Sequence, residues 1–234
     1  RFAAILILFY LSSSYLTKYK SEIKKKLEAD FKEGGQRDWI QVFCNSGPAT
    51  LAAFIYLFVN GETEISIDFT KYPLQSALLA FYIGYYATCC ADTWASELGI
   101  LSKTKPFLIT TFRTVPAGTN GGVSLLGCGA SIGGGFFIGV VYTLCSLFVT
   151  PSNSFEGKAL VIATISGFLG SIIDSLLGAT LQYSGWSSQL NKVVNEETKD
   201  SKLICGRSVL SNNQVNLISA VITGFLTIIV ARGF

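Results

Sequence analysis

Long apolar segments alternate with short polar ones along the whole chain, and this alternation predicts a helical membrane protein. The apolar segments each have close to the roughly 20 residues that a helix needs to cross a bilayer. They cover residues 2–16, 39–59, 74–91, 123–149, 159–181 and 215–231. We therefore expect an all-α, polytopic bundle of about six transmembrane helices, with residues 1–234 forming a single transmembrane domain. Because the chain has no methionine and begins at Arg1, we also expect a further segment upstream.

Composition supports the same class and narrows the chemistry. Half of the residues are hydrophobic, 14% are charged and the mean hydropathy is +0.46, values typical of membrane proteins rather than soluble domains. The chain has no histidine and its six cysteines form no CxxC pair, which excludes the usual zinc sites. No nucleic-acid partner is expected, and the oligomeric state stays open.

Charged residues are distributed unequally between the loops, which predicts the orientation in the membrane. Basic residues follow the first, third and fifth apolar segments, whereas the other loops hold mainly acidic residues. By the positive-inside rule the basic loops face the cytosol. We expect an integral multi-pass protein of the endoplasmic reticulum with these loops in the cytosol. The basic set is Lys18, Lys20, Lys24, Lys25, Lys26, Lys32, Arg37, Lys103, Lys105, Arg113, Lys192, Lys199, Lys202 and Arg207, and the acidic set is Glu62, Glu64, Asp68 and Glu156.

Residues 17–38 form a charged segment after the first span, predicted to be a cytosolic helix and loop. Apolar residues recur every four positions in it, at Tyr19, Ile23, Leu27 and Phe31. This spacing favours a helix over residues 17–33. Two interpretations stay open, because such a helix either lies along the membrane surface or connects two spans in solvent.

Asp174 lies inside the fifth apolar segment, where a charge is unusual. A carboxylate at that depth is unfavourable by several kcal/mol unless it faces a cavity, a cation or a partner, so it indicates a functional site. Gly170 and Gly178 flank Asp174 at a spacing of four, which places all three on one helical face. We expect a groove on this face, with the carboxylate in its wall. The glycines within residues 133–139 are instead expected to let helices pack closely.

The richest polar chemistry lies between the third and fourth apolar segments. Asp92 ends the third segment and Glu97 follows it, so two carboxylates lie near the bilayer surface, where Mg²⁺ with retained waters suits them. The glycine-rich run Gly118 to Gly122 precedes the fourth segment, and successive backbone N–H groups at a helix start bind anions. The run lacks the Lys-Ser/Thr ending of a P-loop, so a flexible turn stays the alternative. The basic residues just upstream are Lys103, Lys105 and Arg113.

Longer motifs resemble those of a known family. They are KEGGQRDW from Lys32, DTWASELG from Asp92, VPAGTNGGVS from Val115, GSIIDSLLGATLQY from Gly170 and LSNNQVNLIS from Leu210. Together they resemble the transmembrane protein 19 family over nearly the whole chain. That family includes the plant phytyl-phosphate kinase, which uses a nucleoside triphosphate, preferably CTP, to convert an isoprenoid monophosphate into its diphosphate.

A more distant likeness is to phosphatidate cytidylyltransferases and dolichol kinases. Asp92-Thr93, the loop from Val115 to Gly122 and the stretch from Gly170 to Ser175 are similar to motifs of those enzymes. Two departures put the cytidylyl-transfer mechanism in doubt. The lysine of the loop is absent, with Gly118 near its place, and residues 211–216 lack the acids of the corresponding segment.

Together with these polar residues, the resemblance implies a CTP-dependent isoprenoid-phosphate kinase that uses Mg²⁺. Its expected partners are membrane lipids, the isoprenoid phosphate and the nucleoside triphosphate. The alternatives are a cytidylyltransferase, a dolichol-kinase-like enzyme or, from another class, an ion- or proton-coupled transporter. The expected site residues are Asp92, Asp174 and Arg113 for catalysis; Asp92, Glu97, Asp174 and Asn213 for Mg²⁺; Lys103, Lys105, Gly118, Thr119, Asn120, Gly121 and Gly122 for nucleotide and phosphate; and Gly170, Gly178, Gln182, Asn212 and Asn216 for the lipid substrate.

Overall fold

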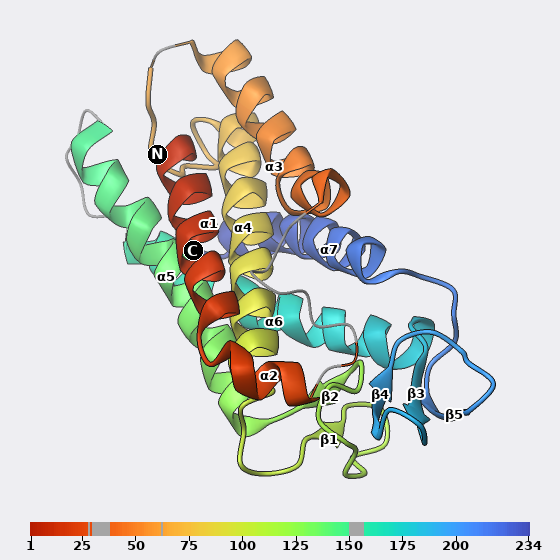
Figure 1. Cartoon of the computed structure of the whole chain (residues 1–234). Coiled ribbons are helices and arrows are strands. Elements are labelled where there is room, and N and C mark those ends of the chain that lie inside the picture. Colours follow the sequence, from red (N-terminus) through yellow and green to blue (C-terminus); the bar gives the residue numbers. More distant parts are fainter. Residues whose placement is uncertain (28, 30–37, 62, 150–156) are drawn as a thin grey trace.

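A computed structural model describes residues 1–27, 29, 38–61, 63–149 and 157–234 of the chain. The described helices are α1 (Phe2–Lys18), α2 (Ser21–Leu27), α3 (Trp39–Asn60), α4 (Pro73–Gly99), α5 (Leu125–Val149), α6 (Gly157–Leu181) and α7 (Asn212–Arg232). The described strands are β1 (Phe107–Leu108), β2 (Gly122–Val123), β3 (Ser184–Ser187), β4 (Lys192–Val194) and β5 (Ser201–Cys205). Figure 1 shows the strands gathered at one end of the helical bundle. We call this the strand end, formed by residues 100–124 and 182–211.

The helical membrane bundle expected from the sequence is confirmed. Among the described residues, α3, α4, α5, α6 and α7 are each long and apolar enough to cross a membrane. The pair α1 and α2 adds a sixth span if it is counted as one broken helix with a bend of 69°. Each predicted apolar segment falls on one of these helices, with α1 covering the first.

The bend between α1 and α2 also changes the charged segment that follows the first span. The sequence favours one helix over residues 17–33, but α1 ends at Lys18 and α2 covers Ser21–Leu27. Lys20 lies between them in the left-handed region, with φ of +52°. Residues 28 and 30–37, which carry most of the first family motif, lie outside the described residues.

The fold is not purely helical, because short strands occupy the strand end. β1 pairs antiparallel with β2, and a three-stranded sheet has the order β4-β3-β5. The longest of these strands, β5, has the sequence Ser-Lys-Leu-Ile-Cys, which lacks the apolar–polar alternation that marks a half-buried strand in a sequence. The expected helical class is therefore confirmed as a mostly helical fold, to which the structure adds two small sheets.

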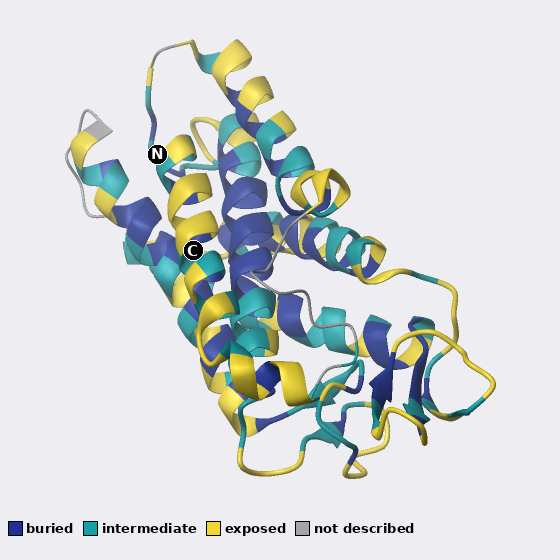
Figure 2. Ribbon diagram, in the orientation of Figure 1, coloured by how far each residue is buried: buried dark blue, intermediate teal, exposed yellow. Residues whose placement is uncertain are grey.

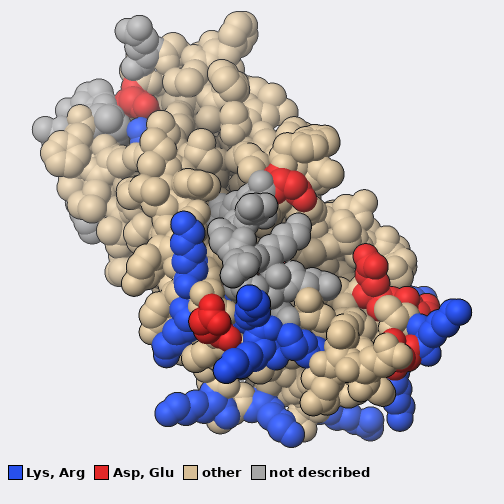
Figure 3. Space-filling view, in the orientation of Figure 1, with Lys and Arg blue, Asp and Glu red and all other residues tan. Residues whose placement is uncertain are grey.

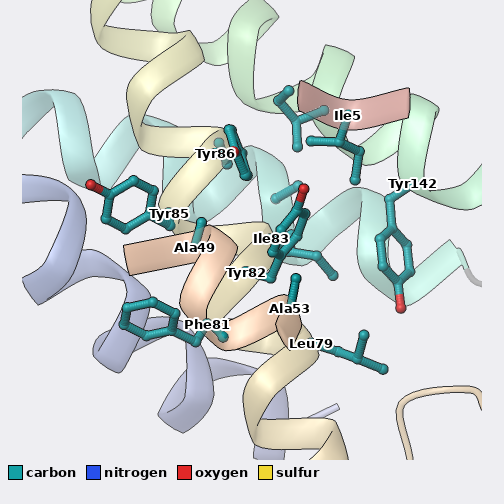
Figure 4. Packing of buried hydrophobic residues seen from close by; sticks show 14 of the residues in the cluster. Ile5, Ala49, Ala53, Leu79, Phe81, Tyr82, Ile83, Tyr85, Tyr86 and Tyr142 are labelled. Carbon is teal, nitrogen blue, oxygen red and sulfur yellow. The ribbon is translucent and has the colours of Figure 1, made fainter. Parts of the chain in front are cut away.

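Helix α4 lies at the centre of the bundle. It packs against α1, α3, α5, α6 and α7, and 78% of its apolar window is buried, against 28–50% in the other four spans. Figure 2 shows it as the most continuously buried helix. Its tyrosines Tyr82 and Tyr86, with ring centroids 4.8 Å apart, share one core cluster with Ile5 of α1 and Ala53 of α3 (Figure 4). Asp92, near the end of α4, is thereby held inside the bundle.

Glycines of α5 let it approach α4 and α6 closely, which confirms the packing interpretation of residues 133–139. A Cβ added at Gly134 would lie 2.8 Å from Ala91 Cα in α4. A Cβ added at Gly139 would lie 2.8 Å from Leu160 Cα in α6. Both distances are shorter than van der Waals contact, so a larger side chain would push the helices apart.

The helices alternate in direction, which brings the basic loops to one end. α1, α4 and α6 run towards the strand end, and α5 and α7 start there (Figure 1). Figure 3 shows Lys and Arg side chains gathered over the same end. The loop before α4 holds Asp68, and the N–H groups of Lys71 and Thr70 that donate to its carboxylate keep its pKa below the usual range. This arrangement agrees with the alternation expected from the charges, and the cytosolic location of the strand end stays a prediction.

Candidate functional site

Four helices meet around one small pocket that contains both intramembrane acids. The pocket is narrow, and its lining side chains pack too closely to leave room for a water molecule between them. Asp174 lies seven residues before the end of α6, so the pocket is about 10 Å inside the bundle from that end. The structure therefore brings together Asp92 and Asp174, as the sequence predicts. The lining residues are Asn45 of α3, Thr88, Cys89 and Asp92 of α4, Asp174 of α6, and Asn216 and Ser219 of α7.

Helix α7 holds the carboxylate of Asp174. The Ser219 hydroxyl donates to Asp174 Oδ2 at 2.8 Å. α7 begins with a capping box, in which the side chains of Ser211 and Gln214 each accept from the other's backbone N–H, and this fixes the start of the helix. Sequence reasoning missed Ser219. A signal was present, because Ser219, Thr223 and Thr227 recur every four residues in an otherwise apolar helix and so share one face.

The groove expected beside Asp174 is filled by packing, so that prediction was wrong. A Cβ added at Gly170 would lie 2.2 Å from Thr88 Oγ1 of α4, and one added at Gly178 would lie 2.9 Å from Gln182 Oε1. Both glycines let neighbouring groups approach α6 and leave no open channel beside it. The choice of helix face was right, because Asp174 does face the pocket.

The glycine-rich loop lies against the end of α6, next to the pocket. A Cβ added at Gly121 would lie 2.5 Å from Ser175 O and 2.4 Å from Ala179 Cβ. Gly121 also has φ of +73°, in the region that favours glycine. Because Ser175 directly follows Asp174, the loop and the acid pair converge on the same stretch of α6.

The strands hold this loop in place through Asn120. Its N–H donates to Ser184 Oγ at 3.0 Å, and its side-chain amide donates to Tyr183 O at 3.0 Å and to Asn195 Oδ1 at 3.1 Å. The Cys205 thiol donates to Asn120 O at 3.5 Å. Burial raises the pKa of this thiol, so it remains a proton donor at neutral pH. The side chain of Asn120, predicted to bind phosphate, therefore serves to shape the loop.

The other residues of the glycine-rich loop offer only main-chain atoms for the predicted contact with phosphate. The Thr119 hydroxyl is buried and donates to Pro116 O at 2.8 Å. The N–H of Gly122 donates to Thr119 O at 2.9 Å, which closes a tight turn. Gly118 is exposed, with φ of +86°. Backbone N–H groups are suitable anion donors, so phosphate binding by the loop stays a prediction for its main chain.

Basic residues of the predicted site lie at the strand end, outside the pocket lining. Lys103, Lys105 and Arg113 are all exposed in the segment between α4 and β2. The segment that carries them, between α4 and β2, lies at the same end of the bundle as the strands (Figure 1). Their position suits attraction of an anionic ligand towards this end.

Of the three asparagines near the start of α7, one lines the pocket and two do not. Asn212 Oδ1 accepts from Gln182 Nε2 at 3.4 Å. Asn213, a predicted metal ligand, is not among the lining residues, because it precedes Ser219 by about 9 Å along the helix axis. Asn216, predicted to contact lipid, lines the pocket instead. The amide of α7 beside the acid pair is therefore that of Asn216.

Glu97, the other predicted metal ligand, faces away from the acid pair. Lys24 Nζ forms an ion pair with Glu97 Oε2 at 2.5 Å, and the Thr17 hydroxyl donates to Glu97 Oε1 at 2.6 Å. Five residues of helix correspond to a rotation of about 140°, so Asp92 and Glu97 face different sides of α4. Lys24 is 1% exposed and also donates to Leu16 O at 2.6 Å. The pair therefore ties α1 and α2 to the end of α4.

Glu97→Ala is expected to lower the free energy of unfolding by about 3 kcal/mol, because it leaves the Lys24 ammonium buried without its partner. The double substitution Lys24→Met with Glu97→Leu replaces the pair by apolar side chains and is expected to recover most of that loss. Thermal unfolding in detergent measures both variants. Mn²⁺ binding then separates the two roles of Glu97: an anchor leaves Mn²⁺ affinity unchanged in the double variant, whereas loss of affinity would show that Glu97 is a metal ligand.

The pocket supplies the oxygen donors that Mg²⁺ prefers. This ion is commonly bound by one or two carboxylates while it keeps waters and takes phosphate oxygens from a nucleotide. Asp92 and Asp174 provide two carboxylates, and among the described residues Asp92 makes no hydrogen bond or ion pair that would compete. Within the same residues no group of three or more His, Cys, Asp or Glu side chains could hold a metal. The donor set thus fits a magnesium–nucleotide complex better than a metal held by protein alone.

Comparison with known proteins identifies the family. The family model described as Integral membrane protein DUF92 matches residues 1–224. The chain belongs to this DUF92 family. The match confirms an integral multi-pass membrane protein, and the predicted resemblance to the transmembrane protein 19 family is confirmed with it.

Curated relatives show how far the DUF92 similarity extends. Protein PGR of Arabidopsis thaliana is 43% identical over 231 residues, which cover 97% of this chain and 80% of that protein. An uncharacterized membrane protein of Synechocystis sp. is 30% identical over 191 residues, which cover 82% of this chain and 67% of that protein. Protein VTE6, chloroplastic, of Arabidopsis thaliana is 28% identical over 188 residues, 80% of this chain and 52% of that protein. No solved structure matches the chain.

The names of these relatives do not assign this protein to the endoplasmic reticulum. The name of Protein VTE6 assigns that protein to the chloroplast. The endoplasmic reticulum therefore stays a prediction for this DUF92 chain, whereas its place in a membrane is shown.

Proposed function

We propose that this DUF92 protein is a membrane-embedded, Mg²⁺-dependent kinase. It transfers the terminal phosphate of CTP, or of another nucleoside triphosphate, to an isoprenoid monophosphate such as phytyl, farnesyl or geranylgeranyl phosphate. One observation carries the proposal: Asp92 and Asp174 face one pocket, and the glycine-rich loop packs on α6 directly beside Asp174. The substrate class comes from the resemblance to the family that includes the phytyl-phosphate kinase.

The reaction requires position and charge neutralisation more than acid–base groups. An oxygen of the acceptor monophosphate attacks the γ-phosphorus of the nucleotide. The bond from that phosphorus to the β–γ bridging oxygen breaks, and the nucleoside diphosphate leaves with the electron pair. Because a phosphate monoester already presents an anionic oxygen, no general base is needed. A chain without histidine can therefore perform this chemistry.

The residues of the pocket and of the strand end have separate proposed roles. Mg²⁺, when bound, would neutralise charge on the triphosphate, and Asp92 and Asp174 would hold it. The N–H groups of Gly118 and Gly121, the two in residues 118–122 that make no hydrogen bond to the described residues, would bind phosphate oxygens. Lys103 and Lys105 would attract the anionic nucleotide, and Arg113 would stabilise charge on the phosphate that is transferred.

The depth of the pocket supports a lipid acceptor. The acid pair lies among membrane-spanning helices, about 10 Å from the end of α6. A substrate whose tail remains in the bilayer can present its phosphate near this level, whereas the nucleotide reaches it from the basic end. We further propose that this end faces the cytosol, as the excess of lysine and arginine there indicates.

Incubation of the purified full chain with γ-labelled CTP, Mg²⁺ and each isoprenoid monophosphate tests the proposal. The expected result is label in an isoprenoid diphosphate, formed only when Mg²⁺ is present. Label in the lipid from α-labelled CTP would instead indicate a cytidylyltransferase, and label on a neutral polyprenol would indicate a dolichol-kinase-like enzyme. If no lipid gains label, the kinase proposal fails, and ion or proton uptake by proteoliposomes would then favour the transporter.

A further inference from the structure

Helix α3 contributes a side chain to the pocket that neither the motifs nor the resemblance singled out. Asn45 lines the pocket with Asp92 and Asp174 and is 8% exposed. Among the described residues its side-chain amide makes no hydrogen bond. Its polar atoms are not among the fully buried side-chain atoms that lack a partner, so they keep some exposure, but a mostly buried amide without a protein partner is still unfavourable. Its position therefore points to a partner that binds in the pocket.

The local sequence explains how α3 presents this side chain. Pro48 lies inside α3 and lacks the N–H that would bond to the Cys44 carbonyl one turn earlier. The Tyr85 hydroxyl of α4 donates to that carbonyl instead. This bond pins α3 to the central helix at the residue that precedes Asn45, so the amide is fixed beside the acids of the pocket.

The polar side chains around the pocket form one set of oxygen donors. Carboxylates come from α4 and α6, and amides come from Asn45 of α3 and Asn216 of α7. Mg²⁺ and Mn²⁺ accept both kinds of oxygen. An amide adds a ligand without a third negative charge, so a divalent cation balances the two carboxylates and a triphosphate can still approach.

We propose that Asn45 is an oxygen ligand of the divalent cation bound between Asp92 and Asp174. This inference rests on the proposed Mg²⁺ site and extends it to a helix without an assigned role. Removal of the amide then weakens binding of the cation itself, before any chemistry. A carboxylate in its place binds the bare cation more tightly but repels the nucleotide.

Mn²⁺ binding to the purified full chain in detergent, followed by the electron paramagnetic resonance of free Mn²⁺, tests this without turnover. Asn45→Ala is expected to weaken Mn²⁺ affinity about tenfold, the lower end of the loss when a metal site is perturbed by one residue. Asn45→Asp is expected to tighten Mn²⁺ binding without nucleotide, because affinity rises with the charge of the ligand set, and to weaken Mn²⁺-dependent binding of the β,γ-methylene analogue of CTP.

The neighbouring residue provides matched controls. The Ser46 hydroxyl donates to Val42 O within α3, and Ser46 is not among the lining residues of the pocket. Ser46→Ala is expected to bind Mn²⁺ as the wild type does. Ser46→Asp adds the same charge as Asn45→Asp one residue away, and it is expected to leave Mn²⁺ affinity unchanged. If it tightens binding as much as Asn45→Asp does, the effect is only one of added charge and the inference fails.

The outcomes distinguish this inference from the kinase proposal. Wild-type Mn²⁺ affinity in both Asn45 variants overturns the inference and leaves the kinase intact. No Mn²⁺ binding by the wild type, either alone or with the β,γ-methylene analogue of CTP, overturns both. Weakened binding in Asn45→Ala, in a chain that transfers no phosphate, supports the cation site and contradicts the kinase. Thermal unfolding is measured on every sample, and if Asn45→Ala does not fold, the comparison of Asn45→Asp with Ser46→Asp decides.

Discussion

Asp174→Asn is expected to abolish phosphoryl transfer while the protein still inserts and folds. Asparagine has nearly the shape of aspartate and keeps an oxygen that can accept the hydrogen bond from Ser219, which is 2.8 Å long in the wild type. The substitution removes the charge that faces the pocket, and with it one of the two carboxylates proposed to hold Mg²⁺. We expect the rate to fall at least about 100-fold, the scale on which loss of one preorganised electrostatic contact slows chemistry.

Initial rates with γ-labelled CTP over a Mg²⁺ titration measure this loss, and thermal unfolding of the same samples reports on the fold. Because a charge in an apolar span is unfavourable, Asp174→Asn is expected to unfold at the same temperature as the wild type or higher. Ser219→Ala is the matched control, since it removes the hydrogen bond but keeps the charge, and its expected loss is only about tenfold. A wild-type rate in Asp174→Asn would reduce the carboxylate to a packing feature.

The sequence could identify Asp174 because its signal does not depend on neighbours. One carboxylate in a long apolar segment is anomalous whatever packs against it. The helices were predictable for a related reason, because the thickness of the bilayer, and not tertiary contacts, sets the length of an apolar segment. The pairing of Asp92 with Asp174 was also accessible, since both were placed near the same side by the alternation of basic loops.

What the sequence could not supply is which polar residues of different helices face one another. Glu97 belongs to the same motif as Asp92, yet the turn of α4 directs it to Lys24. Asn45 lies in no family motif, yet it lines the pocket. The rotation of α3 is fixed by a long-range contact, the hydrogen bond from Tyr85 to the Cys44 carbonyl, which leaves no local pattern. The prediction of a groove at Gly170 was wrong for the same reason, because only the packed structure shows that Thr88 fills that space.

Gly121→Ala is expected to move the glycine-rich loop away from α6 and to remove activity. An alanine at φ of +73° costs about 1 kcal/mol in backbone strain. Its methyl group would lie 2.4 Å from Ala179 Cβ and 2.5 Å from Ser175 O, and relief of such overlap typically costs about 1–3 kcal/mol. The sum is about 3 kcal/mol. Because Ser175 follows Asp174, the shift separates the loop from the acid pair, so activity falls further than stability alone explains.

Alanine substitutions at two other glycines distinguish the cost of backbone strain from the cost of steric overlap. Gly61 has φ of +60° and ψ of −140°, close to a region that is essentially restricted to glycine, and nothing lies within 4 Å of an added Cβ, so Gly61→Ala incurs strain only, about 1–3 kcal/mol. Gly129 in α5 is also open, so Gly129→Ala is expected to stabilise its helix by roughly 0.5–1 kcal/mol. Both variants are expected to keep their activity in the γ-labelled CTP assay. If Gly121→Ala unfolds at the same temperature as Gly61→Ala and remains active, the contact between the loop and α6 has no part in the reaction, because the largest overlap in the loop would then be tolerated.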